Sequence, residues 1–478
     1  MTTQLEVAAQ EQELIARDAP LVRGVGLLGA TAINVISMIG IGPLITIPLV
    51  LGALNGPLSL VGWVLGALIA ICDGLVWAEL GSLYPGSGGT YGYLLEIFGR
   101  ARLGRLLAFL FVWQIIFVAP LNQATGYIGF ANYAGYLFPK LAASPLALKL
   151  AAVAVGVITL VSLYRGITAI AKVGVVLFIA AVGTLLCVIV ASYAHFTPAQ
   201  AVTLAHPDSV WSGLWAGLGQ ALIIAMYDYT GYNQSSCVGG EVRNPARTIP
   251  RSIIISIALV AVLYITMQVG VLGAIPWQSI IPLADGSLPP LAQHVASAIV
   301  EHSFGVITGI VVTILILITA FASVYGNLLG YSRVPFAAAA DGVFLKPFAH
   351  VHQKLRFPDV SLVVMGLIAL VACFFALDQI INALTAGIVL VQSVAQIAAL
   401  AVVRWRGIQP PYRMPLYPLP ALFALAGWLY IFMGAGTPAI VFGIVSISIG
   451  AAVFGIRAAL RHEWPFVTAE KKELPSKT

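Results

Sequence analysis

Two short stretches of this 478-residue chain carry residue types that can bind a small solute inside an apolar environment. The first is SMIGIGP (37–43), which lies within the apolar run 25–54. The second is YDYTGYN (227–233), which follows another apolar run. Glycine and proline weaken or break a helix, so the first stretch predicts backbone amides and carbonyls without helical partners. The second adds a carboxylate, hydroxyls and an amide, and the pair suits a solute that carries both charges.

The composition indicates that these stretches lie in a membrane. Hydrophobic residues make up 60% of the chain and charged residues only 9%, and the mean hydropathy is +0.98. Soluble domains contain roughly 25% charged residues. The sequence therefore predicts an all-α polytopic membrane protein, for which the lipid bilayer is a partner.

Other classes of protein lack support in the sequence. The formal charge of +6 need not indicate a nucleic-acid partner, because its distribution matters more than its sum. The four cysteines lie in apolar segments without paired spacing, so neither disulfides nor a metal site is expected. The chain shows no phosphate-binding loop. We therefore expect no cofactor, no ATP and no nucleic acid, and we do not expect an enzyme.

Hydropathy windows of about 19 residues predict twelve spans. They lie near 25–53, 57–81, 103–137, 147–164, 168–193, 211–239, 252–274, 303–332, 358–376, 379–404, 420–434 and 437–460. With alternating orientation, all of the 24 lysines and arginines except Lys140 and Lys149 fall on the side that holds both termini. Such a basic bias marks the cytoplasmic side. The predicted location is a bacterial cytoplasmic membrane, with both termini in the cytoplasm.

The two stretches interrupt spans 1 and 6, which are five spans apart. Interrupted helices at matching positions of two halves are typical of inverted-repeat transporters, with the binding site at the breaks. Non-helical backbone is tolerated at that depth only where it lines a cavity or is buried in protein. The breaks therefore predict a solute site.

The direction of span 1 predicts which groups the site offers. Its second half should begin near Gly42, with Pro43 in the first turn, and helix N-termini suit anions. Carboxylate-binding amides are expected at Ile41, Gly42 and Leu44. Carbonyls suited to an ammonium group are expected near Ser37, Met38, Tyr227 and Thr230.

Asp73, Glu79 and Asp228 are three acids within the predicted spans that could serve the solute site or its coupling. An acid at membrane depth is expensive and usually faces a cavity or a partner, so Asp228 is interpreted either as a site residue or as a bridge between helices. Asp73 is a candidate proton carrier, because buried carboxylates can exchange protons near neutral pH. Glu79 is interpreted mainly as a partner for cytoplasmic loop groups, and it is kept as a coupling candidate.

Five motifs resemble the amino acid/polyamine/organocation (APC) superfamily. They are GIGP (40–43), AELGSLYPGSGGTYGYL (78–94), GEVRNPARTIPRSI (240–253), YSRVPFAAAADGVFLKPF (331–348) and PPYRMPLYPLP (410–420). The resemblance implies a leucine-transporter-type core of two five-helix inverted repeats, here 24–200 and 201–406, with broken helices 1 and 6. Two further spans, 407–461, and cytoplasmic tails, 1–23 and 462–478, complete the chain. It also implies secondary transport of amino acids or amines, coupled to protons or by exchange.

The resemblance also implies roles for individual residues. Met38, Ile41 and Gly42 match positions that hold the substrate's amine and carboxylate. Tyr227 matches an aromatic gate, Thr230 a carbonyl ligand and Asn233 a polar residue of span 6. The predicted substrate-binding set is Ser37, Met38, Gly40, Ile41, Gly42, Tyr227, Asp228, Thr230, Gly231 and Asn233. The coupling or gating candidates are Asp73, Glu79, Tyr227 and Asp228.

The chain departs from the resemblance at two places. Many members carry a lysine in span 5, about fifteen residues after the glycine that matches Gly166. Here that place is near Ala181, while Lys172 lies too early, so coupling through that lysine is not supported. The second departure is Pro43, which removes one amide from the predicted carboxylate site.

The sequence leaves the substrate class open. Pro43, Asp73 and YRG (164–166) resemble the branch that holds polyamine-uptake transporters. The leading interpretation is a secondary carrier whose partner is an amino acid, with protons as a possible second partner. A polyamine carrier is the alternative, and a channel is a remote one.

Overall fold

The computed structural model describes residues 23–86, 88–100, 102–165, 174–204, 210–283, 287–352 and 357–466. These residues are nearly all helical, with an isolated parallel bridge between Val25 and Val242. Gly166, Lys172 and almost all of the two tails lie outside the described residues. The predicted all-α class is confirmed.

The helices follow one another with short connections. They are α2 (Leu27–Met38), α3 (Gly42–Leu54), α4 (Ser59–Leu83), α5 (Thr90–Phe98), α6 (Leu103–Leu137), α7 (Pro139–Ala142), α8 (Pro145–Arg165), α9 (Gly174–Ala194), α10 (Pro198–Ala201), α11 (Val210–Tyr229), α12 (Gln234–Cys237), η2 (Gly239–Glu241), α13 (Pro245–Ala274), η3 (Trp277–Ser279), α14 (Pro290–Gln293), α15 (Val295–Phe304), α16 (Val306–Ala340), η4 (Lys346–Ala349), α17 (Asp359–Ala372), α18 (Leu377–Ile388), the π-helical η5 (Val389–Val394), α19 (Ala395–Trp405), α20 (Leu419–Gly434) and α21 (Thr437–Leu460).

Within the described part of the chain, seven helices are long and apolar enough to cross a membrane: α4, α6, α8, α13, α16, the continuous run α18–η5–α19, and α21. The pair α2 and α3 would add an eighth span, bent by 50° at its break. Other apolar segments form shorter helices, among them α17 and α20. The structure therefore shows a multi-pass membrane protein, and the count of twelve spans stays a prediction.

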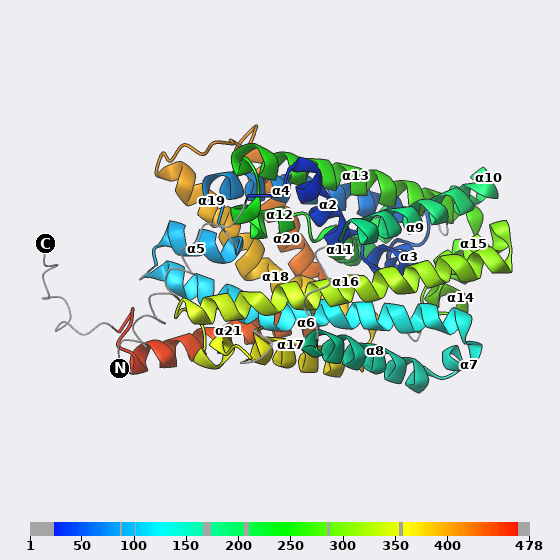
Figure 1. Ribbon diagram of the computed structural model, residues 1–478. Coiled ribbons are helices and arrows are strands. Elements are labelled where there is room, and N and C mark those ends of the chain that lie inside the picture. The colour runs from blue at the N-terminus through cyan, green and yellow to red at the C-terminus, as the bar shows by residue number, and fades with distance from the viewer. Residues whose placement is uncertain are drawn as a thin grey trace, which may run out of the picture.

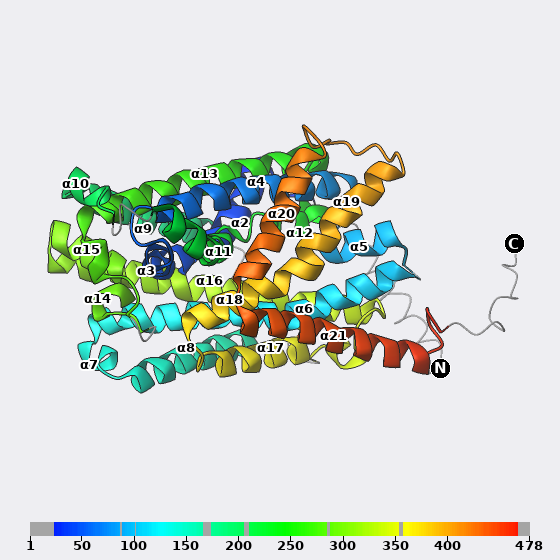
Figure 2. The ribbon, with the colours of Figure 1, turned by 180° about the vertical axis from the view of Figure 1, so that it is seen from behind.

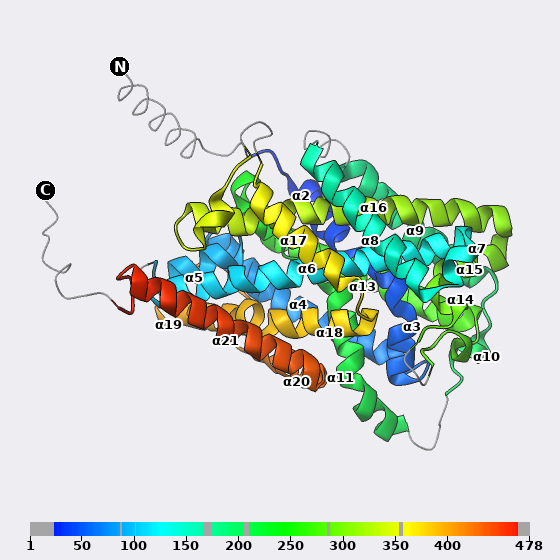
Figure 3. The same cartoon turned by 90° about the horizontal axis from the view of Figure 1, so that it is seen from below.

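The long helices run side by side and enclose the broken ones. In Figure 1, α6 lies along α16, and α4 lies along α13. Figure 2 shows α20 and the α18–α19 run on the opposite face. Seen from below, α21 lies along one edge of the bundle, and α10, α14 and α15 gather at the end away from α5 and α19 (Figure 3). The two predicted breaks both lie inside this bundle.

The first break follows from Gly40, Gly42 and Pro43. Helix α2 ends at Met38, and α3 begins at Gly42 with Pro43 in its first turn. The predicted start of the second half is confirmed. Because Pro43 has no N–H and its ring is best accommodated in the first helical turn, and because Gly40 and Gly42 weaken the helix, one continuous helix through this segment is disfavoured.

The second break follows from Gly231. Helix α11 ends at Tyr229, and α12 begins at Gln234. Between them Gly231 has φ +124°, a conformation that residues with a side chain rarely adopt. A Cβ at this position would lie 2.8 Å from the carbonyl carbon of Ser37. Glycine is therefore needed both for the backbone conformation and for the close approach of the two breaks.

Hydrogen bonds fasten the first half of one broken helix to the second half of the other. Asn34 on α2 donates to the Ser235 hydroxyl at 3.2 Å, and the Ser235 amide donates to Asn34 Oδ1 at 2.7 Å. Before the start of α2, the Val25 amide donates to the Glu241 carbonyl at 3.0 Å. Helices α2 and α12 thus form one attached unit.

We expect Gly231→Ala to destabilise the protein, because the strained conformation and the overlap with Ser37 each cost about 1–3 kcal/mol. The measurement is the thermal unfolding temperature of the purified protein in detergent. Gly183→Ala on α9 is the matched control, since a Cβ there meets nothing within 4 Å and alanine favours the helix. Equal unfolding temperatures for the two variants would contradict the argument.

Candidate functional site

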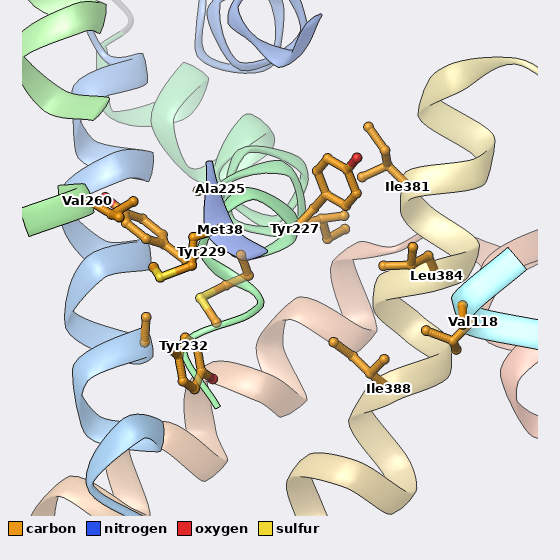
Figure 4. Close-up of a cluster of buried hydrophobic side chains, with 14 of the residues drawn as sticks. Met38, Val118, Ala225, Tyr227, Tyr229, Tyr232, Val260, Ile381, Leu384 and Ile388 are labelled. Atoms are coloured by element: carbon orange, nitrogen blue, oxygen red, sulfur yellow. The ribbon is translucent and has the colours of Figure 1, made fainter. Parts of the chain in front are cut away.

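The ends of the two broken helices meet in the centre of the bundle. Figure 4 shows Met38, at the end of α2, between Tyr227 and Tyr229 of α11. Tyr264 on α13 donates its hydroxyl hydrogen to the Met38 carbonyl at 2.8 Å, and the same hydroxyl lies 3.4 Å from the Asp228 carbonyl. The structure therefore brings the two predicted stretches together.

The first break exposes unpaired amides. Among the described residues, the amides of Gly40, Ile41 and Gly42 donate no hydrogen bond. The amides of Leu44 and Ile45, in contrast, donate to the Ile41 carbonyl at 3.1 and 3.3 Å. The expectation of a free amide at Leu44 is therefore wrong, because the Ile41 carbonyl satisfies it within the first turn of α3.

A small cavity lies beside this break. Its lining combines residues 39–41 and Leu44 with residues of α9 and α16: Ala181, Thr184, Leu185, Ile316 and Thr319. The space has room for about one water molecule. Thr319 Oγ1 is buried without a hydrogen-bond partner among the described residues, so the cavity has one uncommitted polar group.

Asp228 lies in the middle of this arrangement, with only 2% of its surface exposed. Its Oδ2 accepts a hydrogen bond from the Thr46 hydroxyl of α3 at 2.5 Å. Its Oδ1 is buried without a partner among the described residues and lies beside Gly42, where a Cβ would come within 2.5 Å. The carboxylate thus has one satisfied and one unsatisfied oxygen next to the free amides.

Two nearby tyrosines that could have donated a hydrogen bond to the Asp228 carboxylate donate to other groups instead. The Tyr229 hydroxyl donates to the Trp63 carbonyl at 3.3 Å, and the Tyr232 hydroxyl donates to Asp73 at 2.6 Å. No lysine or arginine in the described part of the chain forms an ion pair with Asp228. A buried charge without a partner is costly, so the free oxygen marks a place for a cationic group or a proton.

Tyr227 is buried and connects α11 to α6. Its hydroxyl lies 2.7 Å from Thr125 Oγ1 on α6, and its ring points toward Ile381 of α18 (Figure 4). Thr125 donates its own hydrogen to the Asn122 carbonyl at 2.8 Å, so Tyr227 is the donor of the pair. Thr125 was not among the predicted site residues, and polar residues within span 3 were its only signal in the sequence.

The remaining predicted site residues lie around the breaks. The Thr230 hydroxyl donates back to the Met226 carbonyl at 2.7 Å. Ser37 and Asn233 are half-buried. Gly40 faces α16, where a Cβ would lie 3.1 Å from Ser323 Oγ. Among the described residues, the buried groups of the predicted set that form no hydrogen bond include the amides of Ile41 and Gly42 and Asp228 Oδ1.

The two carboxylates of α4 lie outside the breaks. Asp73 is 2% exposed and is joined to the second break through Tyr232. Glu79 accepts from Arg404 Nη2 at 2.7 Å and from the Met414 amide at 2.6 Å. Glu79 therefore holds α4 to α19 and to the segment before α20.

A comparison with known protein families agrees with this architecture. The family model described as amino acid permease matches residues 25–455. The chain belongs to the amino acid permease family. It is thereby a multi-pass membrane transporter of the APC superfamily, as the sequence motifs predicted.

Proteins that are similar to this permease are named as transporters of several different amino acids. The chain is 26% identical to the serine/threonine exchanger SteT of Bacillus subtilis, over 87% of this chain and 91% of the exchanger. It is 27% identical to the human cystine/glutamate transporter, over 88% and 80% of the two chains. It is 22% identical to the branched-chain amino acid permease BcaP of Lactococcus lactis, over 84% and 86%. These relatives are transporters, which agrees with the expectation that the permease is not an enzyme.

We expect Gly42→Val to abolish transport by this permease. The added side chain would overlap Asp228 Oδ1 and Tyr227 Cε1 and displace the free amides of the first break. The measurement is uptake of a radiolabelled amino acid mixture into proteoliposomes. Gly455→Val on α21 is the control, since a Cβ there meets nothing within 4 Å. Normal uptake by folded Gly42→Val protein would remove this break from the site.

We expect Tyr227→Phe and Tyr227→Ala to differ strongly in their apparent affinity for the solute. The Phe variant loses one hydrogen bond, worth about 0.5–1.5 kcal/mol, and keeps the ring, so its apparent affinity should fall only a few-fold. The Ala variant opens the space beside α18, and its apparent KM should rise about 10-fold or more. Concentration-dependent uptake measures both. Equal, mild effects would make Tyr227 a packing residue.

Proposed function

We propose that this permease is a secondary active transporter of amino acids in a bacterial cytoplasmic membrane, coupled to protons or working by exchange. The solute binds between the breaks of α2/α3 and α11/α12 and is released by alternating access. The proposal includes twelve spans, with inverted repeats at 24–200 and 201–406, two further spans at 407–461, and cytoplasmic tails at 1–23 and 462–478. One observation carries it: the unpaired carboxylate oxygen of Asp228 lies next to Gly42, at the break whose Ile41 and Gly42 amides are unpaired.

These groups suit the two ends of an amino acid. The amides at the N-terminus of α3 can donate to a carboxylate, with the positive end of the helix dipole behind them. The free oxygen of Asp228 can accept from an ammonium group. Both groups are buried, and hydrogen bonds to charged partners are worth about 1.5–3 kcal/mol each. A bound solute would therefore lower the free energy of the protein by supplying partners for the amides of α3 and for the free oxygen of Asp228.

Polyamine transport is the second candidate, and Asp228 is the observation that favours it. The carboxylate stands beside the same amides that would bind the substrate's carboxylate, and like charges there repel. Pro43 removes one further donor. A solute with amino groups and no carboxylate would meet only attraction at Asp228.

The buried acids are the proposed route for proton coupling. Asp73 contacts the second break through Tyr232, so a change of its protonation would alter a hydrogen bond next to Gly231. Asp228 lies in the site itself. In both cases the titrating group is hydrogen-bonded to a residue of a broken helix, which is the condition for linking protonation to helix movement.

A counterflow screen tests the proposal. Proteoliposomes loaded with unlabelled solute are exposed to trace labelled solute, with serine, leucine, arginine, glutamate and putrescine tested separately. Accumulation of one or more amino acids supports the leading proposal, and accumulation of putrescine alone supports the alternative. Flux without counterflow for every solute would indicate a channel and overturn both.

We expect Asp228→Asn to change selectivity or pH dependence, because it removes the charge and keeps the shape. If the carboxylate binds the substrate's amine, affinity for arginine and putrescine should fall by about tenfold or more, and affinity for neutral amino acids should fall less. If it carries a proton, the pH profile of uptake should flatten while exchange persists. The exposed Asp378→Asn is the control. Normal transport of all solutes at every pH would make Asp228 structural.

A further inference from the structure

Tyr264 touches both broken helices with one atom. It lies on α13, is fully buried, and places its hydroxyl 2.8 Å from the Met38 carbonyl and 3.4 Å from the Asp228 carbonyl. Met38 is the last residue of α2, and Asp228 is the last but one of α11. The hydroxyl therefore lies where the C-terminal ends of two helices converge.

Such a meeting point needs a positive group. The C-terminal end of a helix carries about −0.5 elementary charge on its unpaired carbonyls, so two of these ends repel each other in a low-dielectric interior. Among the described residues, no lysine, arginine or histidine bonds to either carbonyl. The hydroxyl hydrogen of Tyr264 is the donor that lies between them.

The ring of Tyr264 is held in place from two sides. Its centroid lies 5.3 Å from that of Trp63 and 5.5 Å from that of Tyr229. Trp63 in turn donates to Gln268 at 3.2 Å and accepts from Tyr229 through its carbonyl at 3.3 Å. Edge-on aromatic contacts of this kind add to the packing. The hydroxyl is thus presented by a rigid group, which is what a positioning role requires.

We propose that Tyr264 is a positioning residue for substrate binding. Its hydroxyl holds the ends of α2 and α11 at the separation at which the free amides of the first break and the free oxygen of Asp228 face one solute. The inference rests on the proposed function, because it takes the solute site to lie at the breaks. Tyr264 itself is bonded to the helix ends and stands behind the site.

The test compares Tyr264→Phe with Tyr193→Phe. Tyr193 lies on α9 and donates to the Thr266 carbonyl of the same helix α13 at 3.2 Å, but it contacts neither break. Both variants lose one tyrosine hydroxyl that donates to backbone carbonyl oxygens: Tyr264 to those of Met38 and Asp228, and Tyr193 to that of Thr266. Concentration-dependent counterflow in proteoliposomes gives the apparent KM and maximal rate, and thermal unfolding in detergent gives the stability.

For Tyr264→Phe we expect the apparent KM to rise about 10-fold, the maximal rate to stay within about twofold, and the added solute to protect less against thermal unfolding. Tyr193→Phe should match the wild type. An unchanged KM in Tyr264→Phe would overturn the inference, and so would a loss of rate and stability at constant KM. If Gly42→Val and Asp228→Asn also transport normally, the proposal that the solute binds at the breaks is wrong. If those two variants lose transport while Tyr264→Phe is normal, only the proposed role of Tyr264 is wrong.

Discussion

Every feature of the central site depends on one constraint: a backbone that leaves helical geometry inside an apolar bundle must find partners for its amides and carbonyls. Unsatisfied backbone groups cost several kcal/mol in a hydrocarbon environment. In this permease most of them are satisfied by the protein. The Ile41 carbonyl caps Leu44 and Ile45, and Tyr264 caps Met38. Among the described residues, the amides of Ile41 and Gly42 and Asp228 Oδ1 form no hydrogen bond, and the proposed binding site depends on these groups.

The carboxylate of Asp228 fits this constraint only in combination with its neighbours. Thr46 satisfies one oxygen, and the absence of a side chain on Gly42 leaves room for the other. A larger residue at position 42 would push the carboxylate away from α3, and a residue without a hydroxyl at position 46 would leave both oxygens unpaired. Gly42 and Thr46 on α3 thus determine, together with Asp228 on α11, where the carboxylate lies. Asp228 is 182 residues from Thr46 in the chain.

The breaks could be predicted from the sequence because their causes are local. Proline without an N–H and glycine without a Cβ act on their own few residues, and the acid at position 228 stands out from its apolar surroundings. The partners of these groups were beyond prediction, because they depend on packing. Nothing in the sequence near Tyr264 or Tyr232 indicates that one would reach Met38 and the other Asp73. The prediction of a free amide at Leu44 was wrong for a related reason: the Ile41 carbonyl accepts a hydrogen bond from that amide.

The same contacts attach the two halves of the first broken helix to different neighbours. Helix α2 is joined to α12 through Asn34 and Ser235 and to α13 through Tyr264. Helix α3 is joined instead to α6, because the Tyr133 hydroxyl donates to the Leu44 carbonyl at 3.1 Å, and Tyr133 also accepts from the first turn of α15. Residues 39–41 connect these two attachments: the Ile39 amide ends α2, and the Ile41 carbonyl begins α3. The segment between the two attachments thus includes Gly40 and Ile41, whose amides form no hydrogen bond among the described residues.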